Sequence, residues 1–396
     1  MTHPGAPRSA WLPAPPLQRK VRRVGVPLVV LILLATVVGL IVIGLTALNP
    51  LGAGIGLVLS SLAMMVVVLA YVWLDRFEPE PPRLLAFAFL WGASVAVVLS
   101  VLLGLYLESL IVVGESDGVS WVSVVVIAPV VEEAAKGAFL LLMMTGRRRN
   151  EVNSLTDCLV YAGLVGAGFA WLEDVLYIAS GESLGDSLLT AALRLIMAPF
   201  AHSLFTTFFG IGVYFALRRR GASAQAGPLL LGYLAAVFTH ALWNGSSLLG
   251  VGWYFGIYLY WMMPLFALAI VLGVQSRRRE QAIVAGKLPG MVQAGLVTPN
   301  EATWLGSLGH RKSALAQAGR QGGRPARKAV KRFASQVVEL AFVRDRIDRG
   351  FGDPRVQAML VEETYALYAA RAAPALQQLA GFQVRPPAPL TARPGW

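Results

Sequence analysis

Eight polar side chains lie within otherwise apolar stretches, and their types could do chemistry. They are Glu132, Glu133, Lys136, Glu173, Asp174, His202, His240 and Asn244. A charged group at the centre of a bilayer costs about 2.5–3.5 kcal/mol on insertion scales, so residues that carry this cost are the first candidates for function. Carboxylates and imidazoles serve as general bases, metal ligands and proton carriers. The set therefore predicts a reactive or ion-binding centre rather than a passive bundle.

Helical spacing divides these residues into faces. Glu132 and Lys136 are four residues apart and share a face, which predicts an ion pair between them. Glu133 points about 100° away and is expected to meet a different partner. His240 and Asn244 are also four residues apart, which places an imidazole and an amide one turn apart on one face.

Two prolines precede the polar residues by one turn. Pro129 lies three residues before Glu132, and Pro199 three before His202. Proline removes a backbone hydrogen bond and bends a helix, so each is expected to loosen its helix next to a polar group.

The elements that hold these residues are predicted from composition. The chain has 396 residues, of which 56% are hydrophobic and 14% charged, and a mean hydropathy of +0.62. Globular domains carry roughly 25% charged residues. These values exclude a soluble enzyme, a disordered chain and a disulfide-rich secreted domain, and they predict an all-α polytopic membrane protein. The single cysteine, Cys158, is expected to be a small packing residue.

Eight segments are apolar over about the 20 residues needed to cross a bilayer. They are 24–48, 51–74, 84–113, 119–145, 155–179, 188–217, 226–248 and 252–274. The alternate loops on one side hold all five basic regions, including the arginine triplets at 147–149, 218–220 and 277–279. The positive-inside rule therefore predicts that both termini are cytoplasmic, with 1–23 as a basic N-terminus and 24–274 as an eight-helix domain.

Residues 275–396 form a third predicted region. They hold 19 Lys and Arg against 8 Asp and Glu, whereas residues 1–274 hold 15 against 14. Apolar residues recur at helical spacing in 326–347 and 355–372, and residues from Pro386 onward are expected to be disordered. A basic tail behind a membrane domain favours binding to anionic lipids over nucleic acid, for which no recognition motif is present.

Depth predicts a common site. Counted from the non-cytoplasmic ends of their helices, Glu132 and His202 lie 13–14 residues in, or roughly 20 Å at 1.5 Å per residue. His240 lies nearer that surface and Glu173 nearer still. The four helices are therefore expected to converge on one cavity in the outer to middle part of the membrane.

Four motifs in this order resemble the PrsW family of intramembrane proteases, which belongs to the wider clan of CAAX prenyl proteases and their Abi relatives. Glu132-Glu133-Ala134-Ala135-Lys136 matches the family's E-E-x-x-K. Phe169 and Glu173 match its F-x-x-x-E, although Asp174 follows where the family has Asn. His202 matches the family's membrane histidine, and His240 with Asn244 matches H-x-x-x-N. The acidic-proline stretch 75–81 also resembles a loop that family members carry before this core.

The resemblance implies hydrolysis of peptide bonds in membrane-anchored proteins, of which anti-sigma factors are the best-known class, in a bacterial cytoplasmic membrane. Two mechanisms are open. In one, His202, His240 and most plausibly Glu173 hold zinc, and Glu132 or Glu133 deprotonates the metal-bound water. In the other, Glu132 and His202 activate water without a metal, and His240 and Asn244 stabilise the oxyanion.

Two other classes of protein remain open on the residues alone. A proton-coupled transporter would also place Glu, His and Lys in a membrane cavity, and inverted repeats would favour it. A non-catalytic membrane scaffold acting through its tail is the other alternative.

Overall fold

The computed structural model describes residues 26–45, 49–111 and 120–384. It separates into two compact units, one formed by residues 21–280 and the other beginning at Gln281. The described residues are mostly helical and contain no strand, which confirms the predicted all-α membrane fold. The N-terminal basic cluster, the loop at 114–118 and the residues from Pro386 onward lie outside the described residues.

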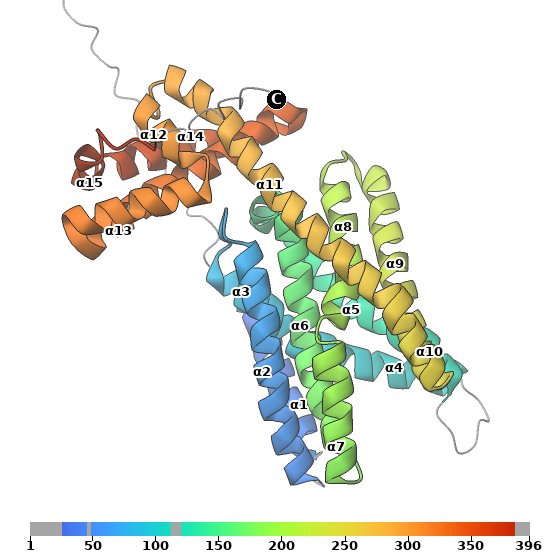
Figure 1. The fold of residues 1–396 in the computed structure, drawn as a ribbon. Coiled ribbons are helices and arrows are strands. Elements are labelled where there is room, and N and C mark those ends of the chain that lie inside the picture. Colours follow the sequence, from blue (N-terminus) through green and yellow to red (C-terminus); the bar gives the residue numbers. More distant parts are fainter. Residues whose placement is uncertain (1–25, 46–48, 112–119, 385–396) are drawn as a thin grey trace, which may run out of the picture. The chain divides into compact units, whose positions relative to one another are not determined.

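The membrane unit contains the following helices (Figure 1): α1 (Val26–Leu45), α2 (Pro50–Leu74), α3 (Pro82–Leu90), the π-helix η2 (Trp91–Ala96), α4 (Val97–Ile111), the π-helix η3 (Ser123–Ile127), α5 (Ala128–Met143), the 3₁₀-helix η4 (Gly146–Glu151), α6 (Leu155–Ala179), α7 (Leu184–Ala191), the π-helix η5 (Ala192–Met197), α8 (Ala201–Leu217), α9 (Ala222–Leu248), α10 (Val251–Ile257), the π-helix η6 (Tyr258–Met262) and α11 (Met263–Gln293).

Six helical segments among the described residues are long and apolar enough to cross a membrane. They are 50–74, 82–111, 155–179, 184–217, 222–248 and 251–293. The other two predicted spans are occupied by α1 and by η3 with α5. The number of eight spans therefore stays a prediction, whereas the polytopic membrane bundle is confirmed.

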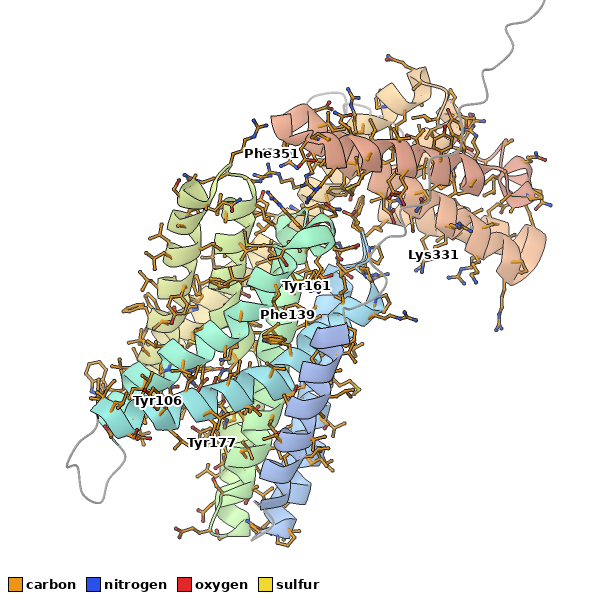
Figure 2. All side chains as sticks on the ribbon, turned by 180° about the vertical axis from the view of Figure 1, so that it is seen from behind. Tyr106, Phe139, Tyr161, Tyr177, Lys331 and Phe351 are labelled. Atoms are coloured by element: carbon orange, nitrogen blue, oxygen red, sulfur yellow. The ribbon has the colours of Figure 1, made fainter. Side chains whose placement is uncertain are left out.

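Helix α6 is the centre of the membrane unit. It packs against α2, α3, η2 and α8, and 89% of its most apolar 18-residue window is buried. Its start is fixed by a capping box, in which the Ser154 side chain accepts from the Asp157 N–H and the Asp157 carboxylate accepts from the Ser154 N–H. On its next turn Tyr161 lies beside Phe139 of α5, with ring centroids 6.2 Å apart (Figure 2).

Glycines let neighbouring helices approach α6 closely, as is usual in membrane bundles. A Cβ atom at Gly166 would lie 2.5 Å from the carbonyl oxygen of His202. The Ser203 hydroxyl donates to the Gly163 carbonyl over 2.8 Å, which adds a hydrogen bond to the same contact. The backbone of α8 at His202 is therefore seated directly on α6.

The two prolines act differently. At Pro199 the helix is interrupted, because residues 198–200 lie between η5 and α8 without regular helical structure. Pro129 instead lies in the first turn of α5, directly after the π-helical turn η3, and the helix continues past it. Both helices therefore depart from a regular α-helix next to the polar residue, as predicted. The helix is broken before His202, and it changes from a π-helix to an α-helix before Glu132.

The acidic-proline loop folds into the protein rather than into solvent. Asp75 and Glu80 are 4% and 5% exposed. The Glu80 N–H donates to Asp75 Oδ2 over 2.9 Å, and the Tyr161 hydroxyl donates to Glu80 Oε2 over 2.7 Å. Burial raises the pKa of Asp75 to about 8, with further contributions from Asp157 and Glu280. Burial also raises the pKa of Glu80 well above its usual range.

The C-terminal unit is a helical domain of its own. It contains the last part of α11, α12 (Pro299–Leu305), α13 (Leu308–Arg346), the π-helix η7 (Ile347–Phe351), α14 (Pro354–Arg371) and α15 (Pro374–Gln378). Helix α13 packs against α12, α14 and α15, and it bends at Gly322 and Gly323, where Gly323 has a φ of 65°. The helices predicted at 326–347 and 355–372 are confirmed as parts of α13 and α14.

Candidate active site

Four helices of the membrane unit bring the predicted polar residues together. Helix α5 carries Glu132, Glu133 and Lys136, α6 carries Glu173, α8 carries His202 and α9 carries His240. The side chains of Glu133 and Lys136 are 0% exposed and that of His240 is 1% exposed, whereas those of Glu132 and Glu173 are 12% and 17% exposed. The four helices therefore bring these side chains together, and Glu132 and Glu173 are more exposed than the other members of the group. The predicted cavity and its depth in the membrane stay predictions.

Lys136 is the cation at the centre of the group. Its Nζ donates to Glu133 Oε1 over 2.8 Å and to Glu132 Oε2 over 3.3 Å. It also lies 3.0 Å from His202 Nδ1 and 3.8 Å from the centroid of the Phe169 ring. The predicted pair of Lys136 with Glu132 is present, but Glu133 is the nearer partner. Glu133 meets other partners as predicted, His240 and Thr206. It also contacts Lys136, because the long lysine side chain reaches the residue three positions earlier as well.

The tautomer of His202 follows from its neighbours. An ammonium group can only donate, so His202 Nδ1 accepts from Lys136. The proton of the neutral ring is then on Nε2, which lies 2.7 Å from Glu173 Oε2 and donates to it. Both nitrogens of His202 are therefore engaged, and Glu173 sets the direction in which the ring faces.

His240 is held in the opposite tautomer. Its Nδ1 lies 3.0 Å from Glu133 Oε1, and this carboxylate also accepts from Lys136 and from the Thr206 hydroxyl. The His240 Nδ1–H therefore donates to Glu133. The His240 Nε2 lone pair then faces Glu132 Oε2 at 3.8 Å, which is too long for a direct hydrogen bond. Phe205 stacks on the ring at 4.6 Å between centroids and fixes its plane.

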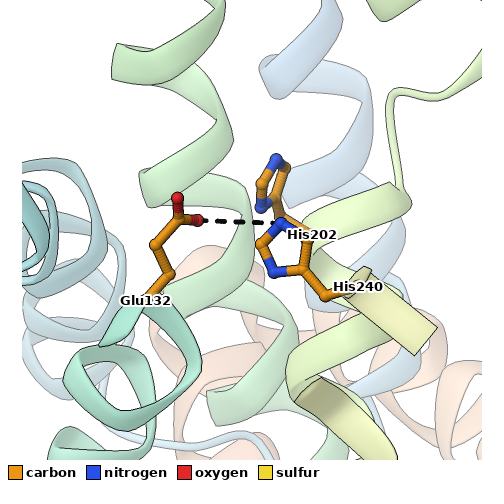
Figure 3. A group of neighbouring side chains, drawn as sticks. All are labelled: Glu132, His202 and His240. Atoms are coloured by element: carbon orange, nitrogen blue, oxygen red, sulfur yellow. Dashed lines mark ion pairs between the residues drawn. The ribbon is translucent and has the colours of Figure 1, made fainter. Parts of the chain in front are cut away.

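The donor types fit a zinc ion. One ligand atom each from Glu132, His202 and His240 lie within 4.8 Å of one another, and Figure 3 shows the three side chains grouped together. Two imidazoles and one carboxylate are a common zinc set. The sequence-based set has Glu173 in place of Glu132, and in the structure Glu173 is instead bonded to His202 and Arg194. Histidines that bind zinc usually donate their other ring N–H to a carboxylate. His240 has this arrangement, because its Nδ1–H donates to Glu133.

Arg194 belongs to the site although its position gave no reason to expect it. Its Nε donates to Asp174 Oδ1 over 2.5 Å, and its Nη2 donates to Glu173 Oε2. Its guanidinium lies 4.2 Å from the centroid of the Tyr177 ring. Arg194 is near the end of a predicted span, where a basic side chain is usually explained by reaching the membrane surface. The acidic pair Glu173-Asp174 was the available signal, because two adjacent buried carboxylates require a cation.

Asn244 bonds the backbone of a neighbouring helix. Its Nδ2 donates to the Val124 carbonyl of η3 over 3.1 Å. The amide therefore ties α9 to the π-helical turn that precedes α5. Its suggested role at the oxyanion stays a prediction.

Comparisons with known proteins agree with this geometry. Residues 80–269, which contain every residue of the group, match the model of the family described as PrsW family intramembrane metalloprotease. The resemblance to PrsW proteases is thereby confirmed. A relative named Protease PrsW, from Geobacillus kaustophilus (strain HTA426), is 26% identical over 234 residues, which cover 57% of this chain and 96% of that protein. No solved structure matches this chain.

The PrsW match supports an intramembrane protease. It ends before the C-terminal unit, since residue 269 lies within α11. The C-terminal unit therefore lies outside the matched residues.

Proposed function

We propose that the membrane unit hydrolyses peptide bonds of membrane-anchored proteins at the group formed by Glu132, Glu133, Lys136, Glu173, His202 and His240. The observation that carries this proposal is the convergence of these side chains from four helices. A buried carboxylate and a histidine with one free nitrogen, 3.8 Å apart, can activate a water molecule between them. An anti-sigma factor is one substrate of the class that the PrsW resemblance implies.

Glu132 is the general base in this proposal. It is the member of the Glu132-Glu133 pair with the longer bond to Lys136 and with an exposed fraction of 12%, so water reaches it. Glu133, by contrast, accepts from Lys136, His240 and Thr206 and serves to orient them. A carboxylate that holds a histidine in one tautomer and stabilises its charged form has the same role in catalytic triads.

His240 is the proton carrier. Its Nε2 faces the reaction side while its Nδ1–H is bonded to Glu133. It can therefore accept on Nε2 the proton that Glu132 takes from the attacking water and pass it to the leaving amine, with the Glu133 carboxylate opposite the resulting charge. His202 is less suited to this task, because Lys136 and Glu173 engage both of its nitrogens.

A zinc-dependent form of the reaction is the second candidate. The observation that favours it is the set of ligand atoms from Glu132, His202 and His240 within 4.8 Å. Zinc would polarise the water and the scissile carbonyl there. An ion bound to His202 Nδ1 must replace the Lys136 ammonium, which lies 3.0 Å from that nitrogen.

The test is cleavage of a membrane-anchored reporter by the purified chain in liposomes. Glu132→Gln is expected to lower kcat by about 10²–10⁴-fold, since it removes the base and keeps the shape. Glu182→Gln, in an exposed loop position, is the matched control. Wild-type cleavage by Glu132→Gln contradicts the assignment of the base.

Metal dependence is read in the same assay. Loss of activity in a chelator and recovery with added zinc support the second candidate. Full activity after exhaustive chelation, with no metal found by elemental analysis, supports the metal-free reaction. In either case Glu132→Gln remains the test of the peptidase itself.

We also propose that the C-terminal unit binds anionic lipid surfaces. Six basic residues of α13 on either side of its bend are exposed: Arg320, Arg324, Arg327, Lys328, Lys331 and Arg332, of which Lys331 is labelled in Figure 2. Each basic residue near an anionic surface contributes about 1 kcal/mol. The proposed cellular location of the protein is a bacterial cytoplasmic membrane, with both termini on the cytoplasmic side.

A further inference from the structure

Two carboxylates next to each other share one cation at the site. Asp174 directly follows Glu173 and places a second negative charge beside it. Asp174 is 3% exposed and the Glu173 side chain 17% exposed. Adjacent carboxylates that are largely buried repel each other and are costly unless a cation lies between them. Arg194 is that cation, because its Nε bonds Asp174 and its Nη2 bonds Glu173.

The contact continues to His202, whose Nδ1 accepts from Lys136, the cation that also bonds Glu132 and Glu133. The oxygen of Glu173 that accepts from Arg194 is Oε2, the same atom that accepts from His202 Nε2 at 2.7 Å. The position of Glu173 Oε2 therefore depends on Arg194 on one side and determines the orientation of His202 on the other. Arg194 lies in η5, before the break at residues 198–200, and His202 lies in the first turn of α8, after it, so Glu173 of α6 links the two sides of the break.

We propose that Arg194 is a positioning residue for the proteolytic site, which fixes Glu173 on His202 and which this chain requires because residue 174 is Asp. The inference rests on the proposed function above. The planar guanidinium is suited to this role, because its fork bonds two carboxylates in fixed directions, whereas a lysine is a single point charge. The Tyr177 ring, 4.2 Å from the guanidinium, supports its plane.

A double-mutant cycle tests the proposal in liposomes with the membrane-anchored reporter. Arg194→Gln is expected to lower kcat by about 10- to 100-fold with little change in KM, because a shift of His202 also moves Lys136 and, with it, the Glu132 base. Asp174→Asn alone keeps the bond from Arg194 to Glu173 and is expected to stay within about threefold of wild type. Arg219→Gln, an exposed arginine outside the site, is the matched control.

The decisive result is the coupling between the two positions. Asp174→Asn removes the second carboxylate, so the loss caused by Arg194→Gln is expected to be several-fold smaller in that background. An equal loss in both backgrounds overturns the proposal. So does a loss that appears in KM alone, which would make Arg194 a substrate-binding residue.

Arg194→Lys covers the case in which Arg194→Gln does not fold. This substitution keeps the positive charge and removes the planar guanidinium that bonds two carboxylates at once. A folded protein with reduced kcat is therefore expected, and a kcat equal to that of the wild type overturns the proposal. A second readout is independent of proteolysis: acylation of His202 by diethyl pyrocarbonate, followed by mass spectrometry. Release of Glu173 in Arg194→Gln or Arg194→Lys is expected to speed this modification relative to Arg219→Gln.

The two proposals fail separately. If wild type does not cleave any reporter but the His202 modification still responds to Arg194, the proposed function fails and the positioning role stands. If cleavage by wild type is robust and neither kcat nor the modification responds to Arg194, the positioning role is wrong and the function stands.

Discussion

Lys136 carries the charge balance of the buried group. Its ammonium contacts two carboxylates and one imidazole, and its side chain is fully buried. A buried ion pair is weak evidence for stability, but breaking one by removing a partner costs about 3–5 kcal/mol. Lys136 is therefore required by Glu132 and Glu133 whether or not it takes part in the reaction. Spacing alone identified the right residue and underestimated how many groups it serves.

Asp75 provides a prediction about pH at the scale of one residue. Burial raises its pKa in the folded chain to about 8, far above its ordinary value of 3.8. The folded chain thus holds this proton over a range where the unfolded chain has lost it, so stability falls as pH rises from about 4 towards about 8. Asp75→Asn is expected to flatten this dependence and to raise the melting temperature at pH 8 by a few degrees.

The measurement is thermal unfolding of the detergent-solubilised chain between pH 5 and pH 8.5. Asp186→Asn is the comparison, because Asp186 lies in an exposed first turn of α7. A pH dependence that is identical in Asp75→Asn and wild type contradicts the assignment.

At the scale of helices, the contact of α6 with α8 determines where His202 lies. Gly166→Ala would place a methyl group 2.5 Å from the His202 carbonyl oxygen, which is backbone and cannot move aside as a side chain can. We expect Gly166→Ala to lower the melting temperature and to reduce kcat by about 10-fold or more, because a shift of about 1 Å in a catalytic group costs up to 10²-fold. Circular dichroism and the reporter assay measure both.

Gly104→Ala is the control for that substitution. Nothing lies within 4 Å of a Cβ atom at Gly104, and alanine favours a helix over glycine by about 1 kcal/mol. It is expected to leave activity unchanged. Similar kcat values for Gly166→Ala and Gly104→Ala would show that the close contact does not position His202.

Much of this arrangement could be predicted from the sequence, and the reason is physical. Charged residues inside apolar segments are rare enough to identify Glu132, Lys136 and His202 without a structure. The partners of each residue could not be predicted in this way. Arg194 of η5 meets Glu173 of α6, and Glu132 rather than Glu173 groups with the two histidines. Such contacts depend on how helices cross, which the periodicity of one helix does not specify.

At the scale of the whole molecule, orientation is the main prediction. The alternation of basic loops places 148, 219 and 278 on the cytoplasmic side and 182 and 250 on the opposite side. Reporter fusions at Arg148, Arg219 and Arg278 should read as inside, and those at Glu182 and Gly250 as outside. An inside result at Glu182 contradicts the orientation and the count of eight spans together.

The C-terminal unit is predicted to be dispensable for the chemistry. A chain truncated after Arg279 keeps all residues of the site and is expected to cleave a detergent-solubilised reporter at a rate close to wild type. The full chain, by comparison, should bind liposomes with anionic lipid more tightly than neutral ones, and added salt should weaken this binding. A folded, membrane-inserted but inactive truncation would make the C-terminal unit part of the enzyme.

The break at residues 198–200 has a consequence for the second reactant of hydrolysis. The first turn of any helix leaves N–H groups without partners inside the helix, and in hydrocarbon such groups are tolerated only where protein or water meets them. Helix α8 begins at Ala201, one residue before His202, and within the break the Ala201 N–H donates to the Ala198 carbonyl. Peptide hydrolysis consumes one water per bond cut. If water meets the remaining N–H groups of this turn, the interrupted helix would bring it to within a turn of His202.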